Sequence, residues 1–171
     1  MLQLRDKISS TRQMIATSRI LKKIARRYRA LFIVNDRLEV AAAAGADGVH
    51  IGRGDVTIST ARAVLGTEAI IGASAGSLRA ASCARADGAD YIGVGPAFRT
   101  PIKPKIAPLL FHSMRLIAKI DIPVFAIGGI TARNISVLKR CGISRVAVIR
   151  AISSSGRPFA ATASLIKALA Q

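Results

Sequence analysis

The chain has 171 residues, of which 51% are hydrophobic, and this length predicts a single domain, residues 1–171, with one substantial core. Only 4% of the residues are aromatic and Trp is absent, so Ala, Ile, Val and Leu must fill that core, which favours an α/β protein over a β-sandwich. A net charge of +17 indicates an anionic partner, either nucleic acid, an anionic membrane surface or a phosphorylated metabolite.

Short apolar runs that read as buried strands recur along the chain and alternate with stretches of helical character. After a first strand at Leu2–Leu4, the predicted strands are Leu31–Val34, Gly48–Ile51, Ile70–Ala73, Tyr91–Val94, Val124–Ile127 and Val146–Ile149. The clearest helical stretches are 12–29, Ser77–Ala86, Leu109–Lys119, Asn134–Cys141 and Phe159–Leu169. The chain is therefore predicted to repeat a strand followed by a helix.

Strands that begin about 15 to 30 residues apart fit right-handed crossover units and a parallel sheet. No early GxGxxG loop marks a dinucleotide site, whereas polar residues follow nearly every strand, which favours a TIM (β/α)₈ barrel over an open, doubly wound sheet. Seven strand–helix units are visible, so we expect a barrel that lacks its first unit. Such a barrel would leave two sheet edges exposed, which favours self-association.

Two aspartates follow neighbouring strands, and they are the sharpest chemical signal in the sequence. Asn35 and Asp36 end one predicted strand, and Asp55 follows the next. Two carboxylates at adjacent strand ends can share one Mg²⁺, which usually takes one or two carboxylates and completes its shell with phosphate oxygens and water. Taken singly, each aspartate could equally be a helix cap or a turn residue.

Later loops add cations and glycines of the kind that bind phosphate. The loop at residues 95–105 is stiffened by prolines and carries Thr100 and Lys103, which suits a diphosphate, although solvated lysines in an ordinary loop would look the same. Gly128 and Gly129 follow the next strand, where backbone amides can approach an anion. Arg150 is predicted to end the last strand and to add a fixed positive charge.

The remaining chemically active residues give weak signals. His50 on an apolar strand reads as a satisfied structural histidine, and His112 is predicted to lie in a helix, with no GxSxG elbow to suggest a hydrolase. Cys83 and Cys141 are isolated, which indicates no zinc site or disulfide and fits a reducing, cytoplasmic compartment. No apolar run reaches the ~18 residues of a membrane span, so we expect no membrane partner.

Several stretches in order along the chain resemble the thiamine-phosphate synthase family, from Gln3 to about Ile152. The matching stretches are Gln3–Lys7, Phe32–Arg37, Gly45–Asp55, Gly88–Pro96, Ala126–Ile130 and Arg145–Val148. The resemblance implies an Mg²⁺-dependent transferase of thiamine biosynthesis that joins hydroxymethylpyrimidine diphosphate to a thiazole phosphate. The diphosphate would leave first, and the thiazole nitrogen would capture the resulting pyrimidinylmethyl cation.

The same resemblance assigns roles to individual residues. It makes Asp36 and Asp55 the Mg²⁺ ligands and places Gln3 and Asn35 at the pyrimidine and its diphosphate. The residues implied to contact the leaving diphosphate are the catalytic cations Arg5, Lys7 and Lys103, with the hydroxyls of Ser74 and Thr100. Those implied to hold the thiazole phosphate are Gly129, Ile149 and Arg150.

The chain also departs from the family pattern at several places. Ile102 stands where the family often has a second hydroxyl, and its loss would remove one diphosphate hydrogen bond, a change of ~1 kcal/mol or more in a dry site. Ala75 and Gly76 replace bulkier polar residues of many relatives. Arg150 replaces a common serine, which keeps anion affinity but occupies more space.

Two other functions compete with this interpretation. A thiazole tautomerase of the same superfamily would handle only the thiazole phosphate, and the presence of Asp36, Asp55 and Lys103 argues against it. A degenerate, non-catalytic barrel could instead bind phosphate or nucleic acid through the positive charge. No aromatic residues are interleaved with the basic ones to stack on bases, which disfavours nucleic acid as the partner.

Overall fold

The computed structural model describes residues 1–170, which form two compact units. Unit 1 comprises Met1–Ser74 and Ala86–Tyr91, and unit 2 comprises Ala75–Arg85 and residues 92–170. The strands are β1 (Leu2–Leu4), β2 (Phe32–Asn35), β3 (Gly48–Ile51), β4 (Ile70–Ala75), β5 (Tyr91–Val94), β6 (Val124–Ile127) and β7 (Arg145–Ala147). The helices are α1 (Thr11–Arg27), α2 (Leu38–Ala44), α3 (Ile58–Leu65), α4 (Leu78–Ala86), α5 (Phe111–Ile117), α6 (Ile135–Arg140), α7 (Arg150–Ser153) and α8 (Pro158–Ala170).

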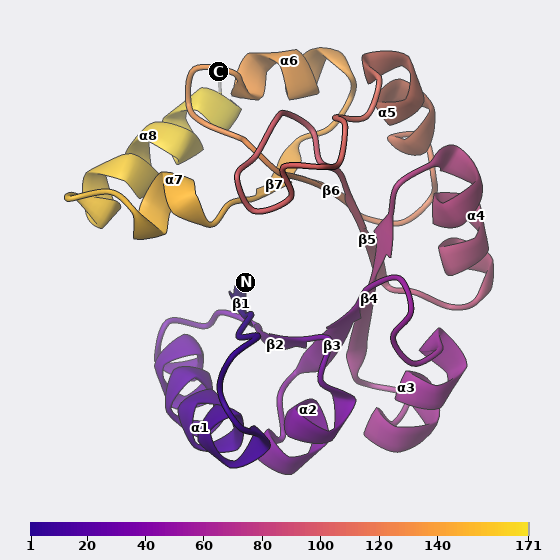
Figure 1. Cartoon of the computed structure of the whole chain (residues 1–171), viewed down its shortest axis with the longest axis vertical. Helices are drawn as coiled ribbons and strands as arrows, with labels where there is room; N and C mark the ends of the chain where they lie inside the picture. Colours follow the sequence, from indigo (N-terminus) through magenta and orange to yellow (C-terminus); the bar gives the residue numbers. More distant parts are fainter. Residues whose placement is uncertain (171) are drawn as a thin grey trace. The chain divides into compact units, whose positions relative to one another are not determined.

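Within each unit the strands are parallel and pair in sequence order. In unit 1, β1 pairs with β2, β2 with β3 and β3 with β4, and in unit 2, β5 pairs with β6 and β6 with β7. Every residue of β2 and β3 is buried, as expected for parallel strands covered on both faces. Helices α1 and α2 lie along one face of the unit 1 strands (Figure 1).

The basic first helix is capped at its N-terminus by its own sequence and contacts α2 through two of its cations. Ser10 and Gln13 form a capping box, in which the Ser10 hydroxyl accepts from the Gln13 amide and the Gln13 side chain accepts from the Ser10 amide. Further along, Arg19 donates to the Ala43 carbonyl at 3.2 Å and Lys22 donates to the Gly45 carbonyl. These two cations therefore satisfy carbonyls at the C-terminal end of α2, where positive charge is favourable.

A Gly-Ala-Asp sequence occurs twice, and in each copy the aspartate forms hydrogen bonds at the start of a pair of parallel strands. The Asp47 carboxylate accepts from the Phe32 amide at 2.7 Å, while the Asp47 amide donates to the Phe32 carbonyl at 2.9 Å. Asp90 makes the same two contacts with Ile71, at 2.7 and 2.8 Å. Two of the stretches that carry the family resemblance are thus explained by strand pairing.

We expect Asp90→Ala to lower the free energy of unfolding by about 1–3 kcal/mol, because it leaves the amide of the fully buried Ile71 without this acceptor. It also removes the 2.7 Å ion pair with Arg62. Urea denaturation measures the change, with Asp87→Ala at an exposed position as the matched control. Equal stabilities of the two variants would contradict this role for Asp90.

All seven predicted strands are present in the described residues, and the last one is shorter than expected. The prediction that β7 runs to Ile149 and ends in Arg150 is wrong. Hydrogen bonds from the amides of Ile152 and Ser153 to the Ile149 carbonyl, at 3.0 and 2.9 Å, turn the chain into the short helix α7. Arg150 is therefore the first residue of a helix.

Within residues 1–170, no helix is both long and apolar enough to cross a bilayer.

Candidate active site

The turn after β1 holds the first predicted site cations. The Asp6 carboxylate accepts from the amides of Ile8 and Ser9 at 2.9 and 3.0 Å. Hydrogen bonds from the Ser9 side chain and then from the Ser9 and Ile8 amides lower the pKa of Asp6 to about 2. Asp6 therefore stays ionised and fixes the turn directly beyond Lys7. The Lys7 ammonium lies 2.6 Å from Oδ2 of Asp36.

Asp36 and Asp55 converge on the same point in unit 1. Asp36 lies immediately after β2 with φ +66°, a left-handed conformation that non-glycine residues seldom adopt and that is concentrated at functional sites. A Cβ placed on Gly52 would lie 3.0 Å from Oδ2 of Asp55 and 3.5 Å from Oδ1 of Asp36. The missing side chain of Gly52 leaves room for both carboxylates, and its amide donates to Oδ2 of Asp55 at 2.7 Å.

The electrostatic surroundings keep Asp36 ionised. Partial burial is the largest single influence and raises the pKa of Asp36. The hydrogen bond and charge of Lys7, a hydrogen bond with Asp55 and the charge of Arg5 all lower this pKa, and together they outweigh burial. The net result is a pKa below the ordinary value of 3.8. Because the folded-state pKa is lowered, the associated stability is present above about pH 4 and is lost as the pH falls through the folded value.

We expect Lys7→Met to raise the pKa of Asp36, because the substitution keeps the length of the side chain and removes its charge and hydrogen bond. The free energy of unfolding should then fall less at acid pH, because the pKa of Asp36 in the folded state lies closer to its pKa in the unfolded state. A carbon NMR titration of the Asp36 carboxyl measures the shift. Lys23→Met, at an exposed position of α1, is the control, and an Asp36 pKa equal in both variants would refute the contribution of Lys7.

The two carboxylates fit the needs of Mg²⁺. A magnesium ion is commonly held by one or two protein carboxylates and by oxygens of a bound phosphate. Over residues 1–170, no third His, Cys, Asp or Glu joins them in a metal-binding cluster. The remaining ligands of an ion here would be other oxygens, such as those of water or of a bound phosphate. The metal assignment stays a prediction.

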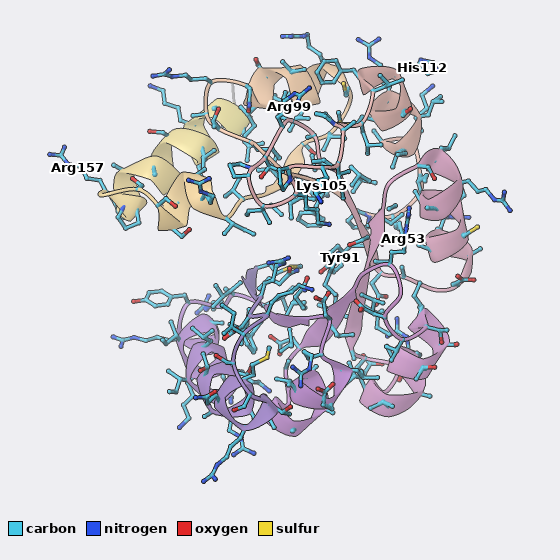
Figure 2. The ribbon with its side chains drawn as sticks, viewed as in Figure 1. Arg53, Tyr91, Arg99, Lys105, His112 and Arg157 are labelled. Atoms are coloured by element: carbon cyan, nitrogen blue, oxygen red, sulfur yellow. The ribbon has the colours of Figure 1, made fainter. Side chains whose placement is uncertain are left out.

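Four polar side chains of unit 1 form a hydrogen-bonded chain on the strands beside this pair. The Gln3 amide nitrogen lies 3.4 Å from the Tyr91 hydroxyl, which lies 3.0 Å from Nδ1 of His50. Nε2 of His50 lies 2.9 Å from the Ser74 hydroxyl. Tyr91, labelled in Figure 2, begins β5 and is buried, as is His50, whereas Ser74 is exposed.

The sequence prediction included Gln3 and Ser74 and missed the two residues that join them. The reading of His50 as a satisfied structural histidine accounts for its contacts but not for its connection to Ser74. The available signal was its position: His50 pairs in register with Asn35, a predicted site residue, on the neighbouring strand. Asn35 itself is buried at the end of β2, and Arg5 is exposed directly after β1.

In unit 2, the predicted diphosphate loop is anchored at its base and exposed at its tip. The amides of Ala97 and Phe98 donate to the carbonyls of Ile127 and Gly128, at 2.8 and 3.0 Å. Lys103 is exposed in the loop, and its amide donates to the Thr100 carbonyl at 3.3 Å. Arg99 and Lys105 of the same loop, labelled in Figure 2, add two more exposed cations.

Gly129 packs directly beneath this loop. Its φ is +63°, and a Cβ at this position would lie 2.4 Å from the Arg99 carbonyl oxygen and 2.9 Å from Cβ of Phe98. Asn134 fixes the turn from the other side, since its side chain donates to the Gly129 carbonyl at 2.9 Å and accepts from the Thr131 amide at 2.8 Å. The structure therefore brings two predicted phosphate elements of unit 2 into contact.

The last two predicted site residues lie where β7 gives way to α7. Ile149 is the residue before α7 and Arg150 its first residue, and both are exposed. Helix α7 has only four residues, a single turn, so the position of Arg150 in it carries no helix-dipole effect of either sign. Arg150 is thus available to an anionic ligand without a helix-stabilising role of its own.

Parallel strands that each lead into a helix, with carboxylates, amides and cations gathered after the strands, define a TIM-barrel-like α/β protein. Residues 1–152 match the family model described as thiamine monophosphate synthase, and the chain belongs to that family. It is 42% identical over 172 residues to a thiamine-phosphate synthase of Thermosynechococcus vestitus, covering 100% of this chain and 49% of the relative. A thiamine-phosphate synthase of Prochlorococcus marinus is 43% identical over 169 residues, which cover 97% of this chain and 48% of the relative.

A solved structure of the same kind matches the whole fold. The thiamine phosphate pyrophosphorylase from Pyrococcus furiosus superposes with a TM-score of 0.90 and 37% sequence identity, over 98% of this chain and 81% of the other. The family and fold predicted from the sequence are thereby confirmed. The chain spans about half the length of the curated relatives named above.

Proposed function

We propose that this chain is a thiamine-phosphate synthase of thiamine biosynthesis, a transferase that works in the cytoplasm on two small phosphorylated substrates. The observation that carries the proposal is the convergence of Asp36 and Asp55 on Gly52, with Lys7 beside them. Membership of the thiamine monophosphate synthase family supports it. The two free cysteines, Cys83 and Cys141, are consistent with a reducing compartment.

The proposed reaction breaks the bond between the pyrimidinylmethyl carbon and the diphosphate oxygen. The electron pair leaves with the diphosphate, and the lone pair of the thiazole nitrogen then forms the new carbon–nitrogen bond. The products are thiamine phosphate and pyrophosphate. Since negative charge develops on the leaving diphosphate, the protein accelerates the reaction by placing donors and cations where that charge appears.

We assign the residues of unit 1 to the diphosphate and the pyrimidine. Mg²⁺ held by Asp36 and Asp55 would offset negative charge on the diphosphate. Arg5, Lys7 and Ser74 donate hydrogen bonds to its oxygens, and the position of Lys7 against Asp36 keeps its ammonium close to the carboxylate pair. Gln3 and the buried Asn35 bind the pyrimidine end of the substrate.

In unit 2 we assign Thr100 and Lys103 to the leaving diphosphate. Gly129, Ile149 and Arg150 hold the phosphate of the thiazole. The contact between Gly129 and the loop that carries Thr100 supports this pairing, because it ties the two phosphate elements to each other. Ile102 supplies no hydroxyl to this loop, so Thr100 and Lys103 provide its donors without a second threonine.

To test the proposal, the purified protein is incubated with hydroxymethylpyrimidine diphosphate, thiazole phosphate and Mg²⁺. Chromatography with mass detection should show thiamine phosphate, and its formation should stop when either substrate is left out or the metal is chelated. Release of pyrophosphate without thiamine phosphate would mean that the diphosphate substrate is only hydrolysed, and the synthase assignment would then be rejected.

A further inference from the structure

The contacts from Gln3 to Ser74 favour one direction of hydrogen-bond donation, because their members differ in what they can donate. The Gln3 amide nitrogen can only donate, so the Tyr91 oxygen is the acceptor in that contact. Burial raises the pKa of Tyr91, which keeps the phenol protonated and leaves it a proton to donate. Nδ1 of His50, 3.0 Å away, is placed to accept that proton.

A neutral histidine carries one ring proton, and a contact that makes one nitrogen an acceptor leaves the proton on the other. If Nδ1 of His50 accepts from Tyr91, then Nε2 carries the hydrogen and donates to the Ser74 oxygen at 2.9 Å. Ser74 then keeps its own hydroxyl proton for an outside acceptor. With the opposite tautomer, Ser74 would give its proton to His50 and offer only lone pairs.

The packing of unit 1 holds this arrangement in place. His50 pairs in register with Gly72 on β4, and Ser74 lies two residues further along, on the same face of the strand. A Cβ on Gly72 would lie 2.0 Å from Cζ of Tyr91, so the missing side chain is what makes room for the phenol ring. The two inner members of the chain are buried, and the last is exposed.

We propose that Tyr91 and His50 are positioning residues that fix the tautomer of His50 and thereby make Ser74 a hydrogen-bond donor to an anionic phosphate oxygen. The identity of that phosphate as the substrate diphosphate rests on the proposed function. The proposed direction of the hydrogen bonds does not rest on it, since it concerns only contacts within unit 1. In this arrangement Ser74 accepts a hydrogen bond from His50 and donates one to the phosphate. Its role is to bind the leaving group and not to take up a proton.

Nitrogen NMR of the full chain tests the tautomer directly, because the sequence contains only two histidines. His112→Gln, on the exposed side of α5, assigns the His50 signals. At a pH where the ring is neutral, we expect the hydrogen of His50 on Nε2. Tyr91→Phe keeps the ring and removes the hydroxyl, and it should shift the population towards hydrogen on Nδ1. A wild-type hydrogen on Nδ1, or a tautomer unchanged by Tyr91→Phe, overturns the proposal.

Calorimetric binding of inorganic pyrophosphate with Mg²⁺ tests the consequence for Ser74. Ser74→Ala should weaken binding about tenfold or more, as expected when a hydrogen bond to a charged group is lost. His50→Asn, which has no donor at the Nε2 position, should show a loss of similar size and add little in the double variant. His50→Gln places an amide donor near the Nε2 position and should retain most of the affinity.

Equal effects of His50→Asn and His50→Gln would show that His50 acts only by filling space, and this would overturn the proposal. If His50→Asn fails to fold in a thermal melt, the tautomer in Tyr91→Phe decides the question. The outcome is also separable from that of the proposed function. If the protein forms thiamine phosphate but His50 carries its hydrogen on Nδ1, the proposed function stands and this inference is rejected. If His50 carries its hydrogen on Nε2 and pyrophosphate binding depends on Ser74, but no thiamine phosphate forms, this inference stands and the proposed function is rejected.

Discussion

Replacing Asp55 with alanine should reduce Mg²⁺-dependent formation of thiamine phosphate by about a hundredfold or more, since offsetting the charge of a leaving group is worth several kcal/mol. The physical reason is the paired geometry with Asp36: removing one carboxylate halves the negative charge that faces the point beside Gly52. Steady-state rates at saturating Mg²⁺ give the change in turnover, and a magnesium titration gives the change in apparent metal affinity.

Asp55 also accepts a hydrogen bond from the Gly52 amide at 2.7 Å, so two variants are needed to separate charge from turn structure. Asp55→Asn retains an acceptor for that amide and removes the charge. If metal binding is the role, Asp55→Asn and Asp55→Ala lose similar activity. A full rate in Asp55→Asn would assign Asp55 to the turn alone. Asp87→Ala, at an exposed position, should leave the rate unchanged.

Gly129→Ala should lower the free energy of unfolding by about 2–4 kcal/mol and weaken the use of thiazole phosphate. An alanine at φ +63° is strained, and its Cβ would overlap the Arg99 carbonyl oxygen, 2.4 Å away. Because the obstacle is backbone, the loop that carries Thr100 must move. Urea denaturation measures the stability, and the KM for thiazole phosphate reports the displaced loop.

Gly45→Ala separates the two causes of this loss. Gly45 has φ +60°, close to the +63° of Gly129, and a Cβ there would meet only the flexible end of the Lys22 side chain, at 3.4 Å, so this variant measures left-handed backbone strain without overlap against backbone. We expect Gly129→Ala to be clearly more destabilising than Gly45→Ala. If the two losses are equal, the contact between Gly129 and the Arg99 carbonyl carries no energetic weight.

Most of the fold could be predicted because the central strands of this chain are apolar and largely buried. Runs such as Phe32–Val34 and Val124–Ile127 are apolar and partly β-branched, and the structure places strands at both. The end of β7 was predicted wrongly because the sequence contains no start signal for helix α7. Ile149 precedes this four-residue helix and makes no side-chain cap, so the usual start signal is absent.

The candidate site could be predicted in part, at the level of which residues follow which strands. Adjacent strand ends explain why Asp36 and Asp55 were expected near one another. Their convergence depends on features that the sequence shows less directly, the left-handed backbone of Asp36 and the missing side chain of Gly52. The link from Tyr91 through His50 to Ser74 was not foreseen, because it joins residues far apart in the sequence.

The most direct measurement of the central claim compares the wild-type chain with the Asp36→Asn/Asp55→Asn double variant in one quantitative assay. Thiamine phosphate and pyrophosphate are counted together after incubation with both substrates and Mg²⁺. We predict that wild type forms the two products in equal amounts and that the double variant forms neither at a measurable rate, although its thermal melt remains cooperative. Equal rates in both proteins, or no thiamine phosphate from wild type, would contradict the account.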